Sequence, residues 1–361
     1  MELNPATPIA DRAAGCIVGA FIGDALGLGP HWYYDLDELR RDFGDWIDGY
    51  ADPKPNAKYH RGMKAGELSQ TGIIMLLLLR SIAECGGYDE TDFTRRLDVE
   101  LLAKLNGKAF GGPGGYTNHS IRQVWQARVN DGKSWGESGG NADTSEAAER
   151  LSILAARYAV DPAATARHAF DNCKLTQTDS LVAQQGVAFA CVLSALIRGE
   201  AFDEQLSDKL MKFVTSGEIP FVAKSSIVAA HEAGSSFGFA SPDALLLPSW
   251  IAEAARDPDT QIEPAWKVSL IYGMSCAINF VLPAAYYLAA RFPRDFESAV
   301  LHAINGGGQN MSRACLAGAL VGAQTGLSGI PQRFLDGLVN GKEIIALAQQ
   351  VVAFNTNPII I

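Results

Sequence analysis

Hydrophobic residues recur with a period close to 3.6 along most of the chain, in long stretches rich in Ala and Leu. Such a period places apolar side chains on one face of a helix, and short groups of Gly, Pro, Asn and Asp separate the stretches. Alternating runs of β-branched residues, which are typical of strands, are almost absent. The pattern therefore predicts an all-α fold, with clear helices at 73–83, 147–158, 182–197 and 344–354.

The stretch 29–65 lacks this period, because Trp, Tyr, Pro, His and charged residues are mixed along it. We expect an irregular, ordered loop or lid there, and loops of this length inside compact domains usually carry function. Length alone favours about two domains. No shift of composition divides the chain, however, so residues 1–361 are expected to form a single domain.

Two segments, 19–27 and 318–326, resemble each other and carry glycine at every fourth position, with Gly15 extending the first series. On a helix this spacing aligns the glycines on one face, where another backbone can approach closely. Each glycine costs about 0.5 to 1 kcal/mol relative to alanine in a helix, so the row predicts tight packing. It does not explain Asp24, because a carboxylate in an apolar stretch needs partners if it is buried.

The aromatic residues of 29–65 allow two interpretations. His31 and His60 lie there with Trp32 and Tyr59, and ordinary packing is sufficient to explain them. An aromatic-rich lid can also stack on a planar ligand such as a base. No histidine stands in a His-Glu-x-x-His arrangement or close to a cysteine, so a zinc site has no local support.

Charge and targeting signals narrow the class of protein. A net charge of −10 without a cluster of Lys and Arg argues against a nucleic-acid partner. Residues 1–5 show no secretory signal, and six scattered cysteines fit reduced thiols in a cytoplasmic protein. The stretch 268–290 is long enough to cross a bilayer. Polar residues lower its hydrophobicity, however, and its two ends show no charge asymmetry that would orient a membrane span. We expect buried core there and no membrane partner.

The segment 15–27, Gly-Cys-Ile-Val-Gly-Ala-Phe-Ile-Gly-Asp-Ala-Leu-Gly, resembles the first signature of the ADP-ribosylglycohydrolase family, and 305–326 looks like its last signature. The resemblance implies a single-domain, all-α orthogonal helix bundle. It also implies that 23–25 and 307–310 belong to one pocket. Family enzymes cleave the N- or O-glycosidic bond between ADP-ribose and an acceptor with two magnesium or manganese ions. A Thr-Asp-Asp-Thr run and an Asp-x-Asp-Thr run after Gly-Gly hold those ions.

This chain departs from the family at both metal-ligating runs. Ser69-Gln70-Thr71-Gly72, or the same run shifted back by one residue, stands where Thr-Asp-Asp-Thr should be. At the other end, Gln309 and Met311 replace the acidic pair. Magnesium favours charged oxygen ligands and dehydrates reluctantly, so we expect neither a two-metal centre nor another cofactor.

Further stretches, at 31–35, 66–72, 135–140 and 310–314, are similar to a divergent branch of the family, the J-type crystallins and selenoprotein J. That branch includes lens proteins with a structural role. The resemblance thus implies two alternative functions. One is a pocket that binds or hydrolyses an ADP-ribose-like, nucleotide or nucleoside-type ligand without metals. The other is a non-catalytic structural or regulatory protein on the same fold.

In the first alternative, Asp24 or Glu67 would serve as general acid or base, and Arg313 would pair with a phosphate or carboxylate. The expected ligand-binding residues are Ser69, Gln70, Thr71, Gln309, Asn310, Ser312 and Arg313. Plainer roles remain open, namely capping of backbone amides for Asp24 and a salt bridge for Glu67 and Arg313. The run 141–146, ahead of a helix that contains Arg150, fits a helix N-cap with acidic first-turn residues.

Overall fold

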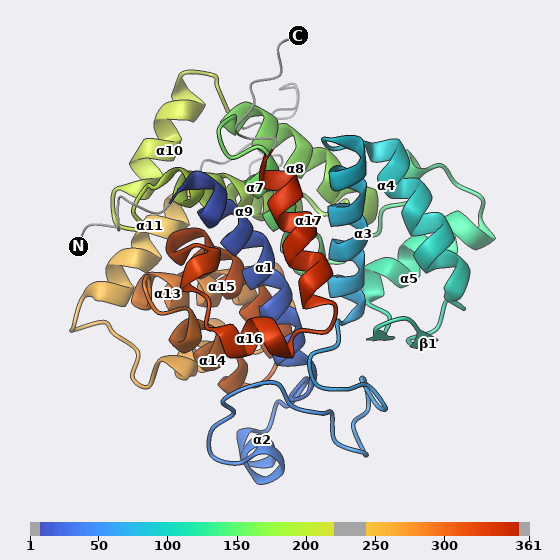
Figure 1. Ribbon diagram of the computed structural model, residues 1–361, viewed down its shortest axis with the longest axis horizontal. Helices are drawn as coiled ribbons and strands as arrows, with labels where there is room; N and C mark the ends of the chain where they lie inside the picture. The colour runs from blue at the N-terminus through green and yellow to red at the C-terminus, as the bar shows by residue number, and fades with distance from the viewer. Residues whose placement is uncertain (1–7, 220–242, 354–361) are drawn as a thin grey trace, which may run out of the picture.

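The computed structural model describes residues 8–219 and 243–353, and α-helices dominate it (Figure 1). The predicted all-α class is therefore confirmed. The α-helices are α1 (Ile9–Leu28), α2 (Leu36–Phe43), α3 (Gln70–Cys85), α4 (Glu90–Arg96), α5 (His119–Trp125), α6 (Glu146–Glu149), α7 (Leu151–Arg157), α8 (Pro162–Thr176), α9 (Ser180–Arg198), α10 (Leu206–Thr215), α11 (Asp243–Arg256), α12 (Val268–Tyr272), α13 (Ile278–Arg291), α14 (Phe296–Asn305), α15 (Asn310–Thr325), α16 (Gln332–Gly337) and α17 (Gly341–Ala353).

Shorter elements connect these helices. Two strands form an antiparallel hairpin, β1 (Phe110–Gly112) with β2 (Gly115–Tyr116). The short π- and 3₁₀-helical turns are η1 (Leu97–Leu101), η2 (Leu102–Lys104), η3 (Gln126–Asn130), η4 (Trp135–Glu137), η6 (Ala265–Lys267) and η7 (Leu327–Gly329).

The centre of the fold is the pair α1 and α15, which Figure 1 shows side by side with α17 next to them. Both helices are buried along almost their whole length. Added Cβ atoms at Gly15 and Gly19 would lie 2.5 and 2.2 Å from the carbonyl oxygens of Gly322 and Gly318. Real Cβ atoms do not approach that closely, so only glycine permits this contact of backbone on backbone. The predicted tight packing of the glycine rows is confirmed.

The four helices predicted from periodicity are present, with one interruption. The stretches 73–83 and 182–197 lie within α3 and α9, and 344–354 lies in α17 apart from Phe354, which is outside the described residues. The stretch 147–158 is not one helix. It is divided between α6 and α7 at Arg150, whose backbone ψ is −10°.

The stretch 268–290 is also not a continuous helix, since α12 ends at Tyr272 and α13 begins at Ile278. Its expected burial holds for α13, of which most residues are inaccessible to solvent. Among the described helices, α9 is the one long and apolar enough to cross a membrane, with a mean hydropathy of 1.8. Because 83% of that window is buried inside the fold, it is a core helix here.

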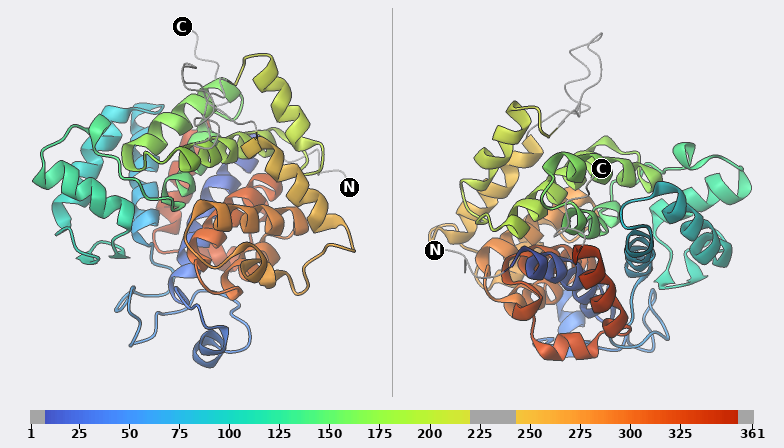
Figure 2. Two further views of the ribbon diagram at one scale, coloured as in Figure 1. Left: turned by 180° about the vertical axis from the view of Figure 1, so that it is seen from behind. Right: turned by 45° about the horizontal axis from the view of Figure 1, so that its top comes forward.

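The segment 29–65 is largely irregular, as expected, and forms the lower part of the molecule in Figure 1 and in the left view of Figure 2. It contains one helix that periodicity did not predict, α2, whose N-terminus is capped by Asp35 through the amides of Asp37 and Glu38. Only Leu39 of α2 is buried, so its apolar pattern is too short to detect. Asn305 fixes the segment by two hydrogen bonds of 2.8 Å to the backbone of residue 47.

Candidate functional site

The candidate site lies where α1 ends and α15 begins. Asn310, the first residue of α15, is fully buried. Its Nδ2 donates to the carbonyl oxygens of Gly27 and Pro30, at 3.3 and 3.2 Å. Its Oδ1 lies 2.9 Å from Nδ1 of His31. One amide side chain therefore joins the start of α15 to the end of α1 and to the start of the segment 29–65.

Asp24 caps the N-terminus of α3. Its Oδ2 accepts from the backbone N–H of Ser69 at 2.9 Å, and its Oδ1 accepts from the Ser69 hydroxyl at 2.5 Å. Burial raises the pKa of Asp24 to about 6, while the hydrogen bonds from Ser69 and from the amide of Gly72 oppose that shift. The carboxylate thus has the backbone-capping role that we considered beside acid or base catalysis.

Ser69 is the N-cap of α3, and its Oγ accepts from the amides of Thr71 and Gly72 at 3.1 and 3.3 Å. The next two side chains turn toward the start of α5. Gln70 donates to the Thr117 hydroxyl at 3.1 Å, and the Thr71 hydroxyl accepts from Asn118 at 2.9 Å. These neutral groups are therefore held by one another.

The first turn of α15 is arranged in a similar way. Gln309 donates from Nε2 to the Ser312 hydroxyl at 2.8 Å, and its Oε1 is buried without a partner in the described part of the chain. Met311 packs on α1, since an added Cβ at Gly27 would lie 2.3 Å from its Cα. An amide, a thioether and a hydroxyl group therefore occupy this turn.

Arg313 is completely buried and points away from these groups toward the end of α14. Its guanidinium donates to the carbonyl oxygen of Ala303 at 3.0 and 2.8 Å, and to that of Gly307 at 2.6 Å. Burial lowers its pKa to about 9. A cation at a helix C-terminus is stabilised by the unpaired carbonyls there. Within the described residues Arg313 forms no ion pair, and its Nη1 is buried without a hydrogen-bond partner.

Glu67 lies apart from this cluster. It is half-buried at a turn before α3, where its Oε2 accepts from the backbone N–H of Lys64 at 2.8 Å. This contact closes the turn 64–67. No ion pair of Glu67 is found among residues 8–219 and 243–353.

Two buried carboxyl groups lie beside α15, namely Glu146 from the run expected to start a helix, and Glu149, which the sequence did not single out. Glu149 accepts from the Ser145 hydroxyl at 2.8 Å, and Glu146 accepts from the hydroxyl groups of Thr144 and Ser120. The helix start expected at 141–146, with acidic residues in its first turn, is present as α6, but Ser145 at the N-cap position makes no capping bond and its hydroxyl donates to Glu149 instead.

The environment of these two carboxyl groups favours their protonated forms. Burial raises the pKa of Glu149 to about 8, and the negative charges of Glu146 and Asp24 add to the shift. The nearby Ser312 hydroxyl offsets part of this rise in pKa. Oε2 of Glu149 nevertheless has no hydrogen-bond partner of standard geometry within the described residues. Burial raises the pKa of Glu146 as well. The pair therefore holds at least one proton at neutral pH.

An aromatic cluster adjoins the polar groups. The ring of Trp32 stacks on His31, with centroids 5.1 Å apart, and meets Tyr59 and Tyr116 edge-on at 4.6 and 5.5 Å. His60 lies 5.1 Å from His31, and burial lowers the pKa of both imidazoles, to about 3 and about 4. Both rings are therefore neutral at physiological pH.

The residues at the metal-ligating positions do not fit a pair of divalent cations. The polar side chains there are neutral and bonded to one another, and Asp24 is engaged by the amides of α3. In the described residues, no three His, Cys, Asp or Glu side chains are placed to hold a metal ion. Magnesium requires charged oxygen ligands to offset its dehydration.

The link between α1 and α3 can be tested at Ser69. Replacing Ser69 by alanine removes the N-cap of α3 and one donor to the buried Asp24, so we expect a loss of about 2 kcal/mol in the free energy of unfolding. Urea denaturation followed by circular dichroism measures it. The control is Ser134→Ala, which replaces an exposed serine ahead of η4 and should change stability by less than about 0.5 kcal/mol. Equal stability of both variants would contradict the proposed cap.

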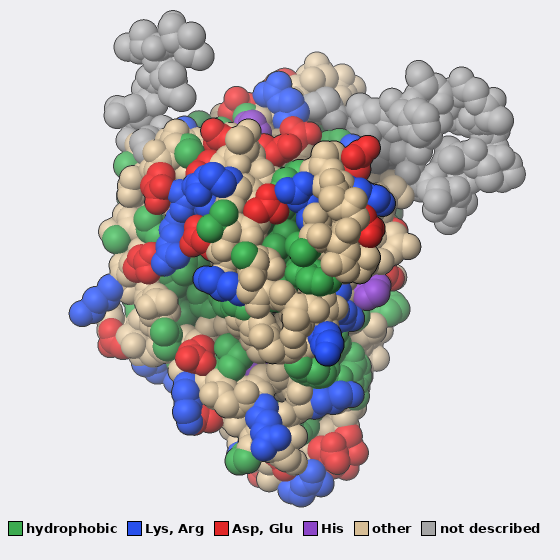
Figure 3. Space-filling view, turned by 90° about the vertical axis from the view of Figure 1, so that its right-hand side faces the viewer, with side chains coloured by type: hydrophobic (Ala, Val, Ile, Leu, Met, Phe, Trp, Pro, Cys, Tyr) green, Lys and Arg blue, Asp and Glu red, His purple; other side chains and the backbone are tan. Residues whose placement is uncertain are grey.

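One face of the molecule carries mixed charge. Figure 3 shows Lys and Arg interspersed with Asp and Glu over this face of the molecule, so no large patch of a single sign forms there.

None of the six cysteines is in a disulfide.

Comparison with known proteins agrees with this architecture. The model of the ADP-ribosylglycohydrolase family matches residues 5–358. An uncharacterized protein of Archaeoglobus fulgidus is 25% identical over 341 residues, which cover 94% of this chain and 96% of that protein. A solved structure of an ADP-ribosylglycohydrolase-related protein complex shares the fold, with a TM-score of 0.61 and 19% identity over 96% of this chain and 98% of that chain. This chain therefore belongs to the ADP-ribosylglycohydrolase family.

Proposed function

We propose that this protein binds a ribosyl ligand of the ADP-ribose or nucleoside type at the junction of α1, α3, α6 and α15, without the family's divalent metals. The observation that supports it most directly is that hydrogen-bonding side chains stand at most of the positions where the family has charged ligands, with Met311 as the exception. Hydroxyl and amide groups of this kind match the hydroxyl groups of a ribose. A pocket with no ligand would tolerate apolar filling at the same positions.

The aromatic cluster supports a planar group on the ligand. Trp32, Tyr59 and Tyr116 present ring faces and edges beside the polar groups, and such rings stack on nucleobases. The indole Nε1 of Trp32 is buried and makes no hydrogen bond of standard geometry in the described part of the chain, with the Tyr34 side chain lying beside it. It is available as a donor to a base or to a ribose oxygen.

For hydrolysis, the proposal assigns acid and base to the pair Glu149 and Glu146. Two neighbouring buried carboxyl groups share one proton at neutral pH, as the raised pKa values of both indicate. The protonated group gives its proton to the departing oxygen or nitrogen as the glycosidic bond breaks. The ionised group accepts a proton from the water that adds to the sugar carbon. Atoms and charge balance without a metal.

Thermal shift and calorimetry with ADP-ribose, adenosine and simple ribosides test the proposal, each in magnesium and in EDTA. We expect a concentration-dependent rise in Tm that is the same in both, since a ligand that binds only the folded state stabilises it. Trp32→Ala should weaken binding at least tenfold. Trp250→Ala, an exposed tryptophan on α11, is the matched control and should bind as the parent does.

Two results would overturn the proposal. If no riboside changes Tm and Trp32→Ala is as stable as the parent, the non-catalytic structural or regulatory role would be favoured. If hydrolysis of an ADP-ribosyl bond appears only with magnesium, the neutral site has been misread and a metal is bound after all.

A further inference from the structure

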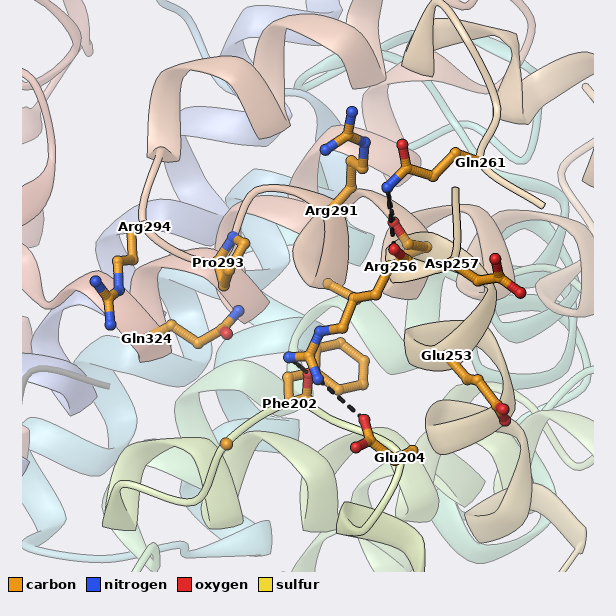
Figure 4. Close-up of a pocket in the computed structure, with 13 residues that line it drawn as sticks. Phe202, Glu204, Glu253, Arg256, Asp257, Gln261, Arg291, Pro293, Arg294 and Gln324 are labelled. Carbon is orange, nitrogen blue, oxygen red and sulfur yellow. Dashed lines mark hydrogen bonds and ion pairs between the residues drawn. The ribbon is translucent and has the colours of Figure 1, made fainter. Parts of the chain in front are cut away.

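A second cavity lies at the other end of α15. It has a volume of about 720 Å³ and is bordered by the ends of α11 and α13, by residues 201–204 and by Gln324 (Figure 4). Small organic ligands occupy cavities of this size. Gln324 and Asn310 are fourteen positions apart on one helix, so the cavity is about 20 Å from the candidate ribosyl site. The two sites are therefore separate.

The floor of the cavity contains a buried acceptor without a donor. Gln324 is only 5% exposed, and its Nε2 donates to the carbonyl oxygens of Ala289 and Leu320, both at 3.2 Å. A flipped amide would place Oε1 against those two oxygens, so the orientation is fixed by its neighbours. Oε1 is left buried with no partner in the described residues. Buried polar atoms rarely remain unpaired, so this oxygen calls for an O–H or N–H group from a bound molecule.

Three arginines line the cavity together with Gln324. Arg294 has no hydrogen-bond or ion-pair partner within residues 8–219 and 243–353, and the buried Nε of Arg291 is also unpaired. Arg256 is held by Glu204 and by the carbonyl of Phe202. Figure 4 shows its guanidinium reaching toward Gln324.

Two of the three arginines at the cavity are ion-paired, Arg256 with Glu204 at 3.2 Å and Arg291 with Glu263 at 2.6 Å, so Arg294 is the lining arginine without an ion pair in the described residues. In Figure 4 the carboxylates of Glu253 and Asp257 point away from the space between Arg294, Gln324 and the guanidinium of Arg256. Arginine binds carboxylate and phosphate oxygens through paired N–H groups. The cavity therefore offers donors for an anionic group next to an acceptor for a hydroxyl or amine.

We propose that this cavity is a second ligand site, which takes a small hydroxylated organic anion, either a carboxylate or a phosphomonoester. The anionic oxygens contact Arg294 and the neighbouring guanidinium groups, and a hydroxyl group donates to Oε1 of Gln324. The inference does not depend on the ribosyl ligand proposed above, because it uses none of the same residues.

Thermal shift and calorimetry at low ionic strength test the site with L-malate, succinate, glycerol 3-phosphate and inorganic phosphate. Malate and succinate differ by one hydroxyl, so malate should bind at least fivefold more tightly. Gln324→Leu should abolish that preference. Stronger binding of malate identifies a carboxylate ligand, and stronger binding of glycerol 3-phosphate identifies a phosphomonoester.

Matched variants separate this site from others. Arg294→Ala should weaken binding at least tenfold, whereas Arg167→Ala, an exposed arginine on α8, should leave it unchanged. Gln309→Ala, in the first turn of α15, should also bind as the parent does. The proposal fails if none of the four anions changes Tm at millimolar concentration, or if Arg294→Ala binds as tightly as Arg167→Ala.

Discussion

Replacing Gly23 by alanine is expected to destabilise the protein by roughly 3 kcal/mol, because the new methyl group has no space between α1 and α15. An added Cβ would lie 2.1 Å from the carbonyl oxygen of Ala314 and 2.5 Å from the amide nitrogen of Cys315. Both are backbone atoms, so relief requires the helices to separate. Urea denaturation monitored by circular dichroism measures the change.

The sign of this result is diagnostic. In a helix free of contacts, alanine is more stable than glycine by about 1 kcal/mol, so a loss of stability can only come from the neighbouring backbone. Gly136→Ala is the matched control, because an added Cβ at this exposed residue would meet no atom within 4 Å. It should change stability by less than about 0.5 kcal/mol. A Gly23→Ala variant as stable as the parent would refute the close approach of the two helices.

Replacing Glu149 by glutamine is expected to stabilise the protein at neutral pH, by roughly 3 kcal/mol at pH 7. The carboxyl group keeps its proton up to about pH 8 in the folded form, whereas in the unfolded chain it loses the proton near pH 4.5. Between these values the folded state binds more protons, so this group lowers stability as the pH rises. Glutamine resembles the protonated acid and removes that dependence.

The measurement compares the free energy of unfolding of the variant and the parent from pH 4.5 to 8. The difference should be near zero at the acid end and should grow steadily with pH. Asp24 and Glu146 also have raised pKa values, and subtracting the parent curve removes most of their contribution. Glu137→Gln, in the exposed turn η4, should give a small, flat difference. A flat difference for Glu149→Gln too would show that its carboxyl group is not perturbed.

The glycine rows show what the sequence can predict about this fold. Their spacing of four residues carries the packing geometry directly, since a missing side chain on one helix face has few other purposes. The need of Asp24 for hydrogen-bond donors was also foreseeable, because a carboxylate in an apolar helix needs partners, although the sequence pointed to neighbouring amides and not to those of α3. Both features depend on residue type and spacing alone.

The buried carboxyl groups could not be found in this way. Glu146 and Glu149 begin a helix, where acidic residues are common on the surface because they favour the helix dipole. Their burial depends on how α6 packs, which local sequence does not encode. The spacing of three between two acids within an Ala-rich stretch is the one signal present. Likewise, the partners of Arg313 are two backbone carbonyls, and no residue type in the sequence identifies them.

The contact of α1 with α15 has a consequence for how such a site can change its chemistry. The separation of Asp24 from the first turn of α15 is set by backbone atoms that touch directly, so no side-chain rotamer can alter it. Exchanging a carboxylate for an amide or a thioether in that turn leaves this spacing intact. The spacing of α1 and α15 therefore does not depend on which side chains occupy the first turn of α15. A scaffold of this kind can lose or regain a metal centre by substitution of a few side chains, with no adjustment elsewhere in the fold.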